Sequence, residues 1–333
     1  MLNSESKIAV IGSGSWGTAL VKLLQNNISK VGWWVRSQET LDYVLSNHRN
    51  PNYLTYAEIV PERLDISTNL NYIKENYDIL VFAIPSAFLN DTLESFGITS
   101  FENKTVVSAI KGIVPKFNLI VAEYFHQNFS ISYDDIAIIA GPCHAEEVAM
   151  QKLSFLTISC QDEEKAKRLS EMFASQYMRL KTSTDVAGTE YAAVLKNIYA
   201  MTNGICIGLG YGDNFQAVLM VNAMRELNRF LSKVFPQYRS FVASEYLGDL
   251  LVTSYSKFSR NRTFGTFIGR GYSVKSTMAE MKMIAEGYYA TKCLVEINKE
   301  YEIDLPIIQT TYNILYEGFS PVVEMKILTD KLS

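Results

Sequence analysis

The sequence predicts an α/β protein in which an N-terminal, doubly wound and mostly parallel sheet is followed by an all-α domain. In the first half, short β-rich runs alternate with longer amphipathic stretches, which is the pattern of βαβ units. Those runs are apolar almost throughout, as expected for strands covered by helices on both faces. From about Asp185 onwards the strand-like runs almost vanish and helical spacing takes over.

Two domains are predicted because 333 residues are more than a single hydrophobic core usually accommodates. We place them at residues 1–185 and 186–333, because strand-like runs give way to helical spacing at that boundary. The strands expected in the first domain are Ile8 to Ile11, Val31 to Val35, Ile79 to Ile84, Val106 to Ala109, Ile136 to Ala140, Phe155 to Ser159 and Met178 to Lys181.

Helical spacing in the second domain begins with Val194, Ile198, Met201 and Ile205, which recur at intervals that place them on one buried face. At about 100° per residue, Lys196 lies about 200° from Val194 and therefore off that face.

A second long helix is expected to start at Asp213, as a capping residue, and to run towards Phe235, where Pro236 blocks its continuation. Further helices are expected at Val274 to Met281, Gly287 to Glu300 and Pro306 to Tyr316.

Composition and charge exclude several classes of function. The 31 basic residues are balanced by 35 acidic ones and form no dense stripe, so nucleic acid is not an expected partner. The first residues lack the long apolar core of a signal peptide, and no apolar run reaches the length of a membrane span. Because cysteines and histidines are scattered, we expect no metal site and a reducing, cytoplasmic location. The scattered residues are Cys143, Cys160, Cys206, Cys293, His48, His126 and His144.

A glycine-rich turn near the start of the chain predicts a dinucleotide site. The run K-I-A-V-I-G-S-G-S-W-G-T-A-L is a strand that leads through Gly12, Gly14 and Gly17 into a helix. Gly12 permits the tight turn, Gly14 lets a pyrophosphate approach the backbone, and Gly17 lets the helix pack closely. The alternative is a flexible loop, but the order of strand, turn and helix favours the cofactor site. The expected binding residues are Gly12, Ser13, Gly14, Ser15, Trp16 and Gly17.

The second predicted strand ends in Arg36, about twenty residues beyond the glycines, where an acidic residue normally holds the ribose 2′-hydroxyl of NAD. Arg36 with Ser37 suits the 2′-phosphate of NADP instead, because guanidinium and phosphate form parallel charge-assisted hydrogen bonds. We therefore expect NADP or NAD as cofactor, with NADPH preferred. A solvated arginine at a strand end is the alternative.

Further segments are placed where such a fold closes around a substrate: V-F-A-I-P-S from Val81, S-A-I-K-G-I with Lys111, and G-P-C-H-A-E-E from Gly141. The helical half adds L-K-N-I-Y-A-M-T-N-G-I, L-G-D-L and S-R-N-R. Together with the glycine turn, these segments resemble the bacterial-type NAD(P)-dependent glycerol-3-phosphate dehydrogenases. The resemblance runs in order from Ile8 to about Lys292, and S-R-N-R-x-F-G and L-K-N are its specific parts.

The resemblance implies a Rossmann-like cofactor domain and reversible oxidation of sn-glycerol 3-phosphate to dihydroxyacetone phosphate, which supplies phospholipid synthesis. It implies that Lys196 is the catalytic acid and base, with a pKa lowered by burial and a second cation, for which Lys111 is the candidate. Taken alone, Lys196 would be read as a lysine on a solvated helix face. The implied substrate residues are Lys111, Gly141, Cys143, Lys196, Asp249, Ser259, Arg260 and Asn261. The implied further cofactor residues are Lys111, Ala145, Arg260, Ile284 and Glu286.

The chain departs from the family pattern after Gly141-Pro142, where the family has serine or threonine followed by an aromatic residue and this chain has Cys143-His144. A thiol is a weaker hydrogen-bond donor than a hydroxyl, which puts a substrate contact from Cys143 in doubt.

Two other functions are compatible with the predicted architecture. One is a hydroxyacid or hydroxyacyl dehydrogenase, although no histidine here lies in a comparable motif. The other is a catalytically silent dinucleotide sensor, which predicts loss of the catalytic residues that are present here. The resemblance also implies a homodimer formed through the helical domain.

Overall fold

The computed structural model describes residues 6–281 and 284–333, which form two compact units. The first contains the residues up to Ile110 together with Val121–Val186, and the second contains Lys111–Ile120 and Ala187–Ser333. Each unit has its own cluster of buried hydrophobic side chains. Residues 111–120, which precede the boundary expected from the sequence, cluster with the helical unit.

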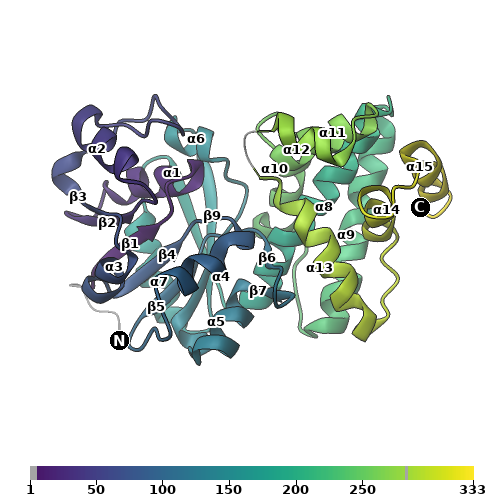
Figure 1. The fold of residues 1–333 in the computed structure, drawn as a ribbon. Helices are drawn as coiled ribbons and strands as arrows, with labels where there is room; N and C mark the ends of the chain where they lie inside the picture. The colour runs from purple at the N-terminus through teal and green to yellow at the C-terminus, as the bar shows by residue number, and fades with distance from the viewer. Residues whose placement is uncertain (1–5, 282–283) are drawn as a thin grey trace. The chain divides into compact units, whose positions relative to one another are not determined.

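Within the described residues, eight strands of the first unit form one sheet in the order β10-β9-β8-β5-β4-β1-β2-β3. Figure 1 labels β1 to β5 and β9 of this sheet. All neighbours pair in parallel except β8 and β9, which are antiparallel. The strand order reverses between β1 and β4, and parallel sheets bind ligands at the carboxyl ends of the strands beside such a reversal. The strands are β1 (Ile8–Ile11), β2 (Val31–Trp34), β3 (Leu64–Ser67), β4 (Ile79–Phe82), β5 (Thr105–Ser108), β8 (Ile136–Ala140), β9 (Ser154–Cys160) and β10 (Met178–Ser183).

The helices of the first unit connect these strands, and several begin directly after a strand that ends at the carboxyl edge. They are α1 (Ser15–Leu24), α2 (Gln38–Asn47), α3 (Leu70–Asn76), α4 (Ser86–Ser95), α5 (Val121–Phe129), α6 (Ala145–Ala149) and α7 (Glu163–Phe173). The residues that begin α1, α2 and α4 therefore lie at the edge where a ligand is expected.

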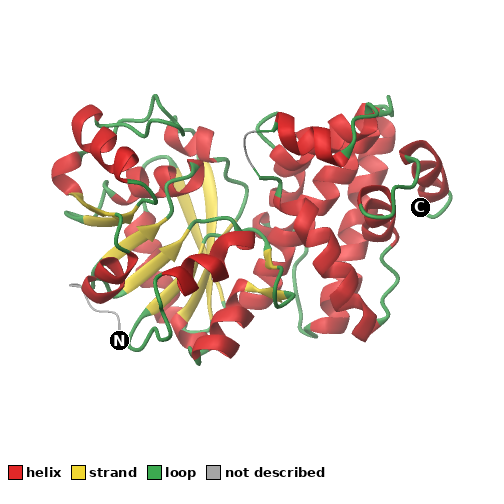
Figure 2. Ribbon diagram, in the orientation of Figure 1, coloured by secondary structure: helices red, strands yellow, loops and turns green. Residues whose placement is uncertain are grey.

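Where the structure describes it, the second unit is helical apart from a short antiparallel hairpin, β6 (Ile113–Val114) and β7 (Leu119–Ile120) (Figure 2). Its helices are α8 (Val186–Gly208), α9 (Asp213–Val234), α10 (Asp249–Tyr255), α11 (Arg260–Gly269), α12 (Val274–Glu280), α13 (Glu286–Tyr301), α14 (Pro306–Leu315) and α15 (Pro321–Thr329).

The fold class predicted from the sequence is confirmed, but two local predictions are wrong and one strand of the sheet was missed. Lys196 does not point away from the core, because every residue of α8 from Gly188 to Cys206 is buried. Asp213 is the first residue of α9 rather than its cap, since Gly212 occupies the capping position and Asp213 Oδ1 accepts a hydrogen bond from Gln216. The edge strand β3 was not predicted.

Glycines bring α8 and α11 into backbone contact. A Cβ atom at Gly204 would lie 2.1 Å from the carbonyl oxygen of Arg262, and one at Gly265 would lie 1.9 Å from that of Met201. Neither clash can be relieved by a side-chain movement, because the opposing atoms belong to the backbone. This close packing fixes the start of α11 relative to the part of α8 that carries Lys196.

Candidate active site

The second unit contains a buried ion pair between Lys196 of α8 and Asp249, the first residue of α10. The Lys196 ammonium contacts Asp249 Oδ1, and the two side chains are 4% and 1% exposed. Asp249 follows a π-helical turn, Ser244–Gly248. Ionised groups are rarely buried this deeply unless they are paired, so the position of each charge depends on the other.

Burial lowers the pKa of the Lys196 ammonium to about 7, and it is the largest of the effects on this group. The Asp249 carboxylate acts in the opposite direction and raises that pKa, whereas the Lys111 ammonium lowers it. A lysine with a pKa near neutrality exists as both ammonium and amine, which is the property that a proton-transferring group needs.

Lys111 precedes the β6–β7 hairpin and is held near Lys196 through the backbone. The side-chain amide of Asn197, the residue after Lys196, donates a hydrogen bond of 2.7 Å to the Lys111 carbonyl oxygen. Asn197 was not predicted as a site residue. Its only signal in the sequence is its place in the L-K-N motif. Its hydrogen-bond partner, Lys111, lies 86 residues earlier in the chain.

The starts of α11 and α13 meet α8 at the same place. Gly287 in the first turn of α13 donates its N–H to Asn261 Oδ1 at 2.9 Å. A Cβ atom at Gly287 would lie 2.7 Å from the Asn197 carbonyl oxygen, so no side chain fits between α13 and α8. Because the Asn261 oxygen is committed to Gly287, its amide N–H groups point in another direction.

The S-R-N-R segment forms the N-terminus of α11. Ser259 is buried and caps the helix by accepting a hydrogen bond from the N–H of Arg262, whereas Arg260 is exposed. Ile284 and Glu286 are partly buried where the chain enters α13. Lys111, Lys196, Asp249, Asn261 and the start of α13 thus belong to one unit and are joined by its contacts.

The first unit carries the glycine turn between β1 and α1. Gly12 has φ +126°, and a Cβ atom at Gly17 would lie 2.1 Å from the Gly12 carbonyl oxygen, so both positions need glycine. Nothing lies within 4 Å of a Cβ built at Gly14, which leaves open space beside the turn. The first turn of α1 has no acidic residue. The turn fits the pyrophosphate of a dinucleotide, since a helix N-terminus attracts anions.

Ser13, Ser15 and Trp16 lie on this turn and on the first turn of α1. Arg36 follows β2 and is exposed, and the Ser37 hydroxyl caps α2 by accepting a hydrogen bond from the N–H of Thr40. Both residues therefore lie at the carboxyl edge next to the glycine turn.

The G-P-C-H-A segment lies between β8 and α6. Gly141 directly follows β8, and Ala145 is the first residue of α6. The Cys143 thiol is buried and donates a hydrogen bond of 2.8 Å to the Phe155 carbonyl oxygen. The Cys143 thiol therefore has a hydrogen-bond acceptor within the first unit itself.

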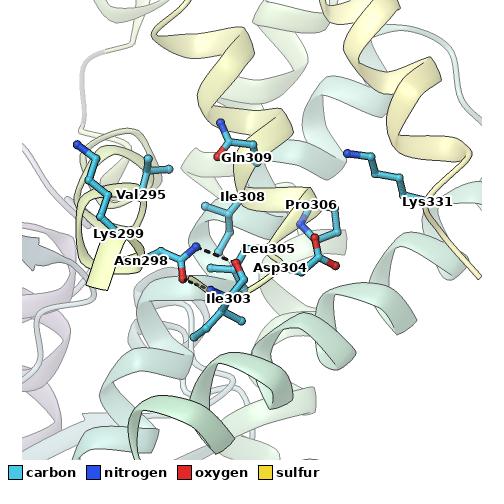
Figure 3. A pocket seen from close by; sticks show the side chains of 10 residues that line it. All are labelled: Val295, Asn298, Lys299, Ile303, Asp304, Leu305, Pro306, Ile308, Gln309 and Lys331. Carbon is cyan, nitrogen blue, oxygen red and sulfur yellow. Dashed lines mark hydrogen bonds between the residues drawn. The ribbon is translucent and has the colours of Figure 1, made fainter. Parts of the chain in front are cut away.

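A separate pocket of about 300 Å³ lies between the C-terminal half of α13 and the start of α14 (Figure 3). Asn298 closes one side through hydrogen bonds with both backbone groups of Ile303. None of the predicted site residues lines this pocket.

The parts of the chain that the structure describes contain no cluster of three histidine, cysteine or acidic side chains placed to hold a metal ion. The same residues include no helix that is both long enough and apolar enough to cross a membrane.

Comparison with known proteins gives the family. Residues 7–166 match the model of the NAD-dependent glycerol-3-phosphate dehydrogenase N-terminus, and residues 185–326 match that of the C-terminus. The chain belongs to this family. A glycerol-3-phosphate dehydrogenase [NAD(P)+] of Exiguobacterium is 36% identical over 322 residues, which cover 96% of this chain and 94% of the relative.

Solved structures agree with the family assignment. The glycerol-3-phosphate dehydrogenase of Coxiella burnetii superposes with a TM-score of 0.90 at 25% identity and covers 97% of this chain and 98% of its own. A ketopantoate reductase from Ralstonia eutropha shares the fold alone, with a TM-score of 0.62 at 14% identity over 96% of this chain and 99% of its own. As a glycerol-3-phosphate dehydrogenase family member, the chain is an oxidoreductase that uses NAD or NADP.

Proposed function

We propose that this chain interconverts sn-glycerol 3-phosphate and dihydroxyacetone phosphate and that Lys196 moves the proton at the reacting oxygen. The observation that carries the proposal is the buried Lys196–Asp249 pair, with the lysine pKa near 7. The nicotinamide cofactor, when bound, supplies or accepts the hydride.

In the reducing direction, the Lys196 ammonium donates a proton to the ketone oxygen as negative charge develops there. In the oxidising direction, the neutral Lys196 amine accepts the proton of the hydroxyl. Asp249 holds the nitrogen in place in both directions, and Lys111 keeps the lysine acidic enough to lose its proton. General acid and base catalysis of this kind contributes about 10²- to 10⁴-fold.

The N-terminus of α11 supplies the phosphate contacts of this proposal. Ser259, Arg260 and Asn261 offer a hydroxyl, a guanidinium and an amide at a helix end that favours anions. Binding the phosphate there orients the reacting carbon, so that binding energy remote from the reaction lowers the barrier. Gly141, Cys143 and Ala145 contribute mainly through the backbone, because the Cys143 thiol is already paired with Phe155.

The proposal also covers the division of the ligands between the two domains and the cellular role of the product. We assign the cofactor to residues 1–185 and the substrate and catalytic groups mainly to 186–333. In this proposal Lys111 and Arg260 contribute to both ligands, and Ile284 and Glu286 contribute to the cofactor. The product supplies phospholipid synthesis in the cytoplasm. The four buried cysteines support a reducing compartment, because none of them forms a disulfide.

A homodimer through the helical unit completes the proposal. Val322, Val323 and Ile327 on α15 are exposed apolar side chains that suit such a contact. Sedimentation at micromolar concentration tests it, and a monomer would contradict it.

The reaction is tested by following NADPH absorbance with dihydroxyacetone phosphate as substrate. We expect turnover with this ketone and little with 2-oxo acids or acyl substrates, since the α11 N-terminus is suited to a phosphate. Turnover only with a 2-oxo acid would indicate a hydroxyacid dehydrogenase. Cofactor binding without turnover of any ketone would indicate a dinucleotide sensor.

Arg36 is proposed to confer a preference for NADPH. The Arg36→Glu variant is expected to raise KM for NADPH by about tenfold or more while KM for NADH changes little, because a carboxylate repels the 2′-phosphate. The control is Arg168→Glu, which makes the same charge change at an exposed position of α7. Equal KM values for both cofactors in the unmodified enzyme would refute the preference.

A further inference from the structure

The glycine turn is held by hydrogen bonds to its carbonyl groups. The Gly12 oxygen accepts one from the Trp33 indole N–H at 2.9 Å, and the Ser13 oxygen accepts one from the Asn50 side-chain amide at 2.9 Å. The Gly14 oxygen accepts the N–H of Thr18 inside α1, also at 2.9 Å. Three successive carbonyl groups of the turn are therefore directed into the protein.

Trp33 is fully buried on β2 and reaches the turn from the neighbouring strand. A second hydrogen bond joins the turn to the same end of β2, because the Gly12 N–H donates to the Trp34 carbonyl oxygen at 3.1 Å. Both backbone groups of Gly12 are thus fixed by β2, the strand that leads directly to Arg36.

Asn50 is 1% exposed and lies in the segment that follows α2. Its Oδ1 accepts the N–H groups of Asn52 and Tyr53, at 2.9 and 3.1 Å. Its Nδ2 donates both to Ser13 and to the Thr18 hydroxyl, the latter at 2.8 Å. Because the oxygen is engaged by its own loop, the amide has one orientation in which its donors face the turn.

The direction of these carbonyl groups decides what the turn presents to a ligand. In a trans peptide unit the C=O and the next N–H point in opposite directions. Fixing the carbonyl groups of Gly12, Ser13 and Gly14 therefore turns the N–H groups of Ser13, Gly14 and Ser15 away from the Trp33 and Asn50 side. The space around Gly14 is open, so an anion can approach there.

We propose that Trp33 and Asn50 are positioning residues for the cofactor pyrophosphate, which act by holding the carbonyl oxygens of the glycine turn away from it. A carbonyl oxygen that rotated outward would place a partial negative charge against the pyrophosphate and remove a donor. The two side chains thus preorganise an anion site that they do not touch. The proposal concerns cofactor binding and stands apart from the role of Lys196.

Ligand binding to three compounds tests it without turnover. NADPH and ADP-ribose contain the pyrophosphate, whereas adenosine 2′-monophosphate contains only the adenosine and the 2′-phosphate. We expect Asn50→Asp and Trp33→Phe each to raise Kd for NADPH and ADP-ribose about tenfold, because each loses a hydrogen bond that orients the turn. Kd for adenosine 2′-monophosphate should stay within about twofold, as should kcat at saturating cofactor.

Trp34→Phe is the matched control, because the Trp34 indole donates to the Thr68 carbonyl oxygen and not to the turn. It makes the same change on the adjacent residue of β2 and should leave all three Kd values unchanged. The proposal is overturned if ADP-ribose binds both variants as tightly as the unmodified protein. The proposal is also overturned if Kd for adenosine 2′-monophosphate rises as much as Kd for ADP-ribose, since that result indicates general loss of the local fold. If affinity for ADP-ribose falls in only one of the two variants, the residue replaced in the other variant does not position the turn.

Discussion

Replacement of Lys196 by alanine is expected to lower kcat for dihydroxyacetone phosphate reduction by about 10²- to 10⁴-fold, with NADPH affinity unchanged. The reason is that the variant lacks the ammonium that protonates the reacting oxygen, whereas the glycine turn belongs to the first unit and is unaltered. Steady-state rates and NADPH fluorescence titration measure the two effects separately.

Small amines separate a chemical role of Lys196 from a structural one. The alanine variant leaves space beside the buried Asp249, and added methylammonium should restore part of the activity by occupying it. Lys233→Ala, at an exposed position of α9, is the control and should behave as the unmodified enzyme. Retained kcat in the Lys196→Ala variant would remove this residue from the acid and base role.

Replacement of Asp249 by asparagine is expected to move the pH dependence of both reaction directions to lower pH. Reduction needs the Lys196 ammonium, so its kcat/KM should fall as pH rises through about 7 in the unmodified enzyme, while oxidation should rise. The Asp249 charge raises the lysine pKa against the lowering by burial and by Lys111. Without that charge the lysine loses its proton at lower pH.

At neutral pH the Asp249→Asn variant should therefore reduce dihydroxyacetone phosphate more slowly, by roughly several-fold, since a smaller fraction of Lys196 is protonated once its pKa lies below the assay pH. Asp330→Asn, an exposed substitution in the same unit, controls for the loss of one negative charge. A pH profile that keeps its midpoint in Asp249→Asn would show that this carboxylate does not set the state of the lysine.

Much of the fold was predictable because its signals are local. The apolar runs that became β1, β4 and β8 are buried along their whole length and lie between clear helical stretches. The strand β3 was missed because only Leu64 of its four residues is buried, so it lacks the apolar run of a central strand. The hairpin β6–β7 was missed because its strands have two residues each.

The environment of the site depends on contacts that sequence spacing does not encode. Helical periodicity placed Lys196 off the buried face, because it assumes one polar side, whereas α8 is enclosed on all sides. The pairing of Lys196 with Asp249 and the bond from Asn197 to Lys111 both join distant segments. Resemblance to the family pointed to Lys196 and Asp249, and the structure supplies the burial that lowers the lysine pKa.

We expect the Lys196 nitrogen to contact the reacting oxygen of the substrate. A crystal structure with both cofactor and dihydroxyacetone phosphate bound tests it most directly. We predict a distance of about 2.6–3.2 Å between Lys196 Nζ and the ketone oxygen, with Asp249 on the other side of the nitrogen. A structure in which another proton donor contacts that oxygen, and Lys196 lies beyond hydrogen-bond reach, would contradict the account.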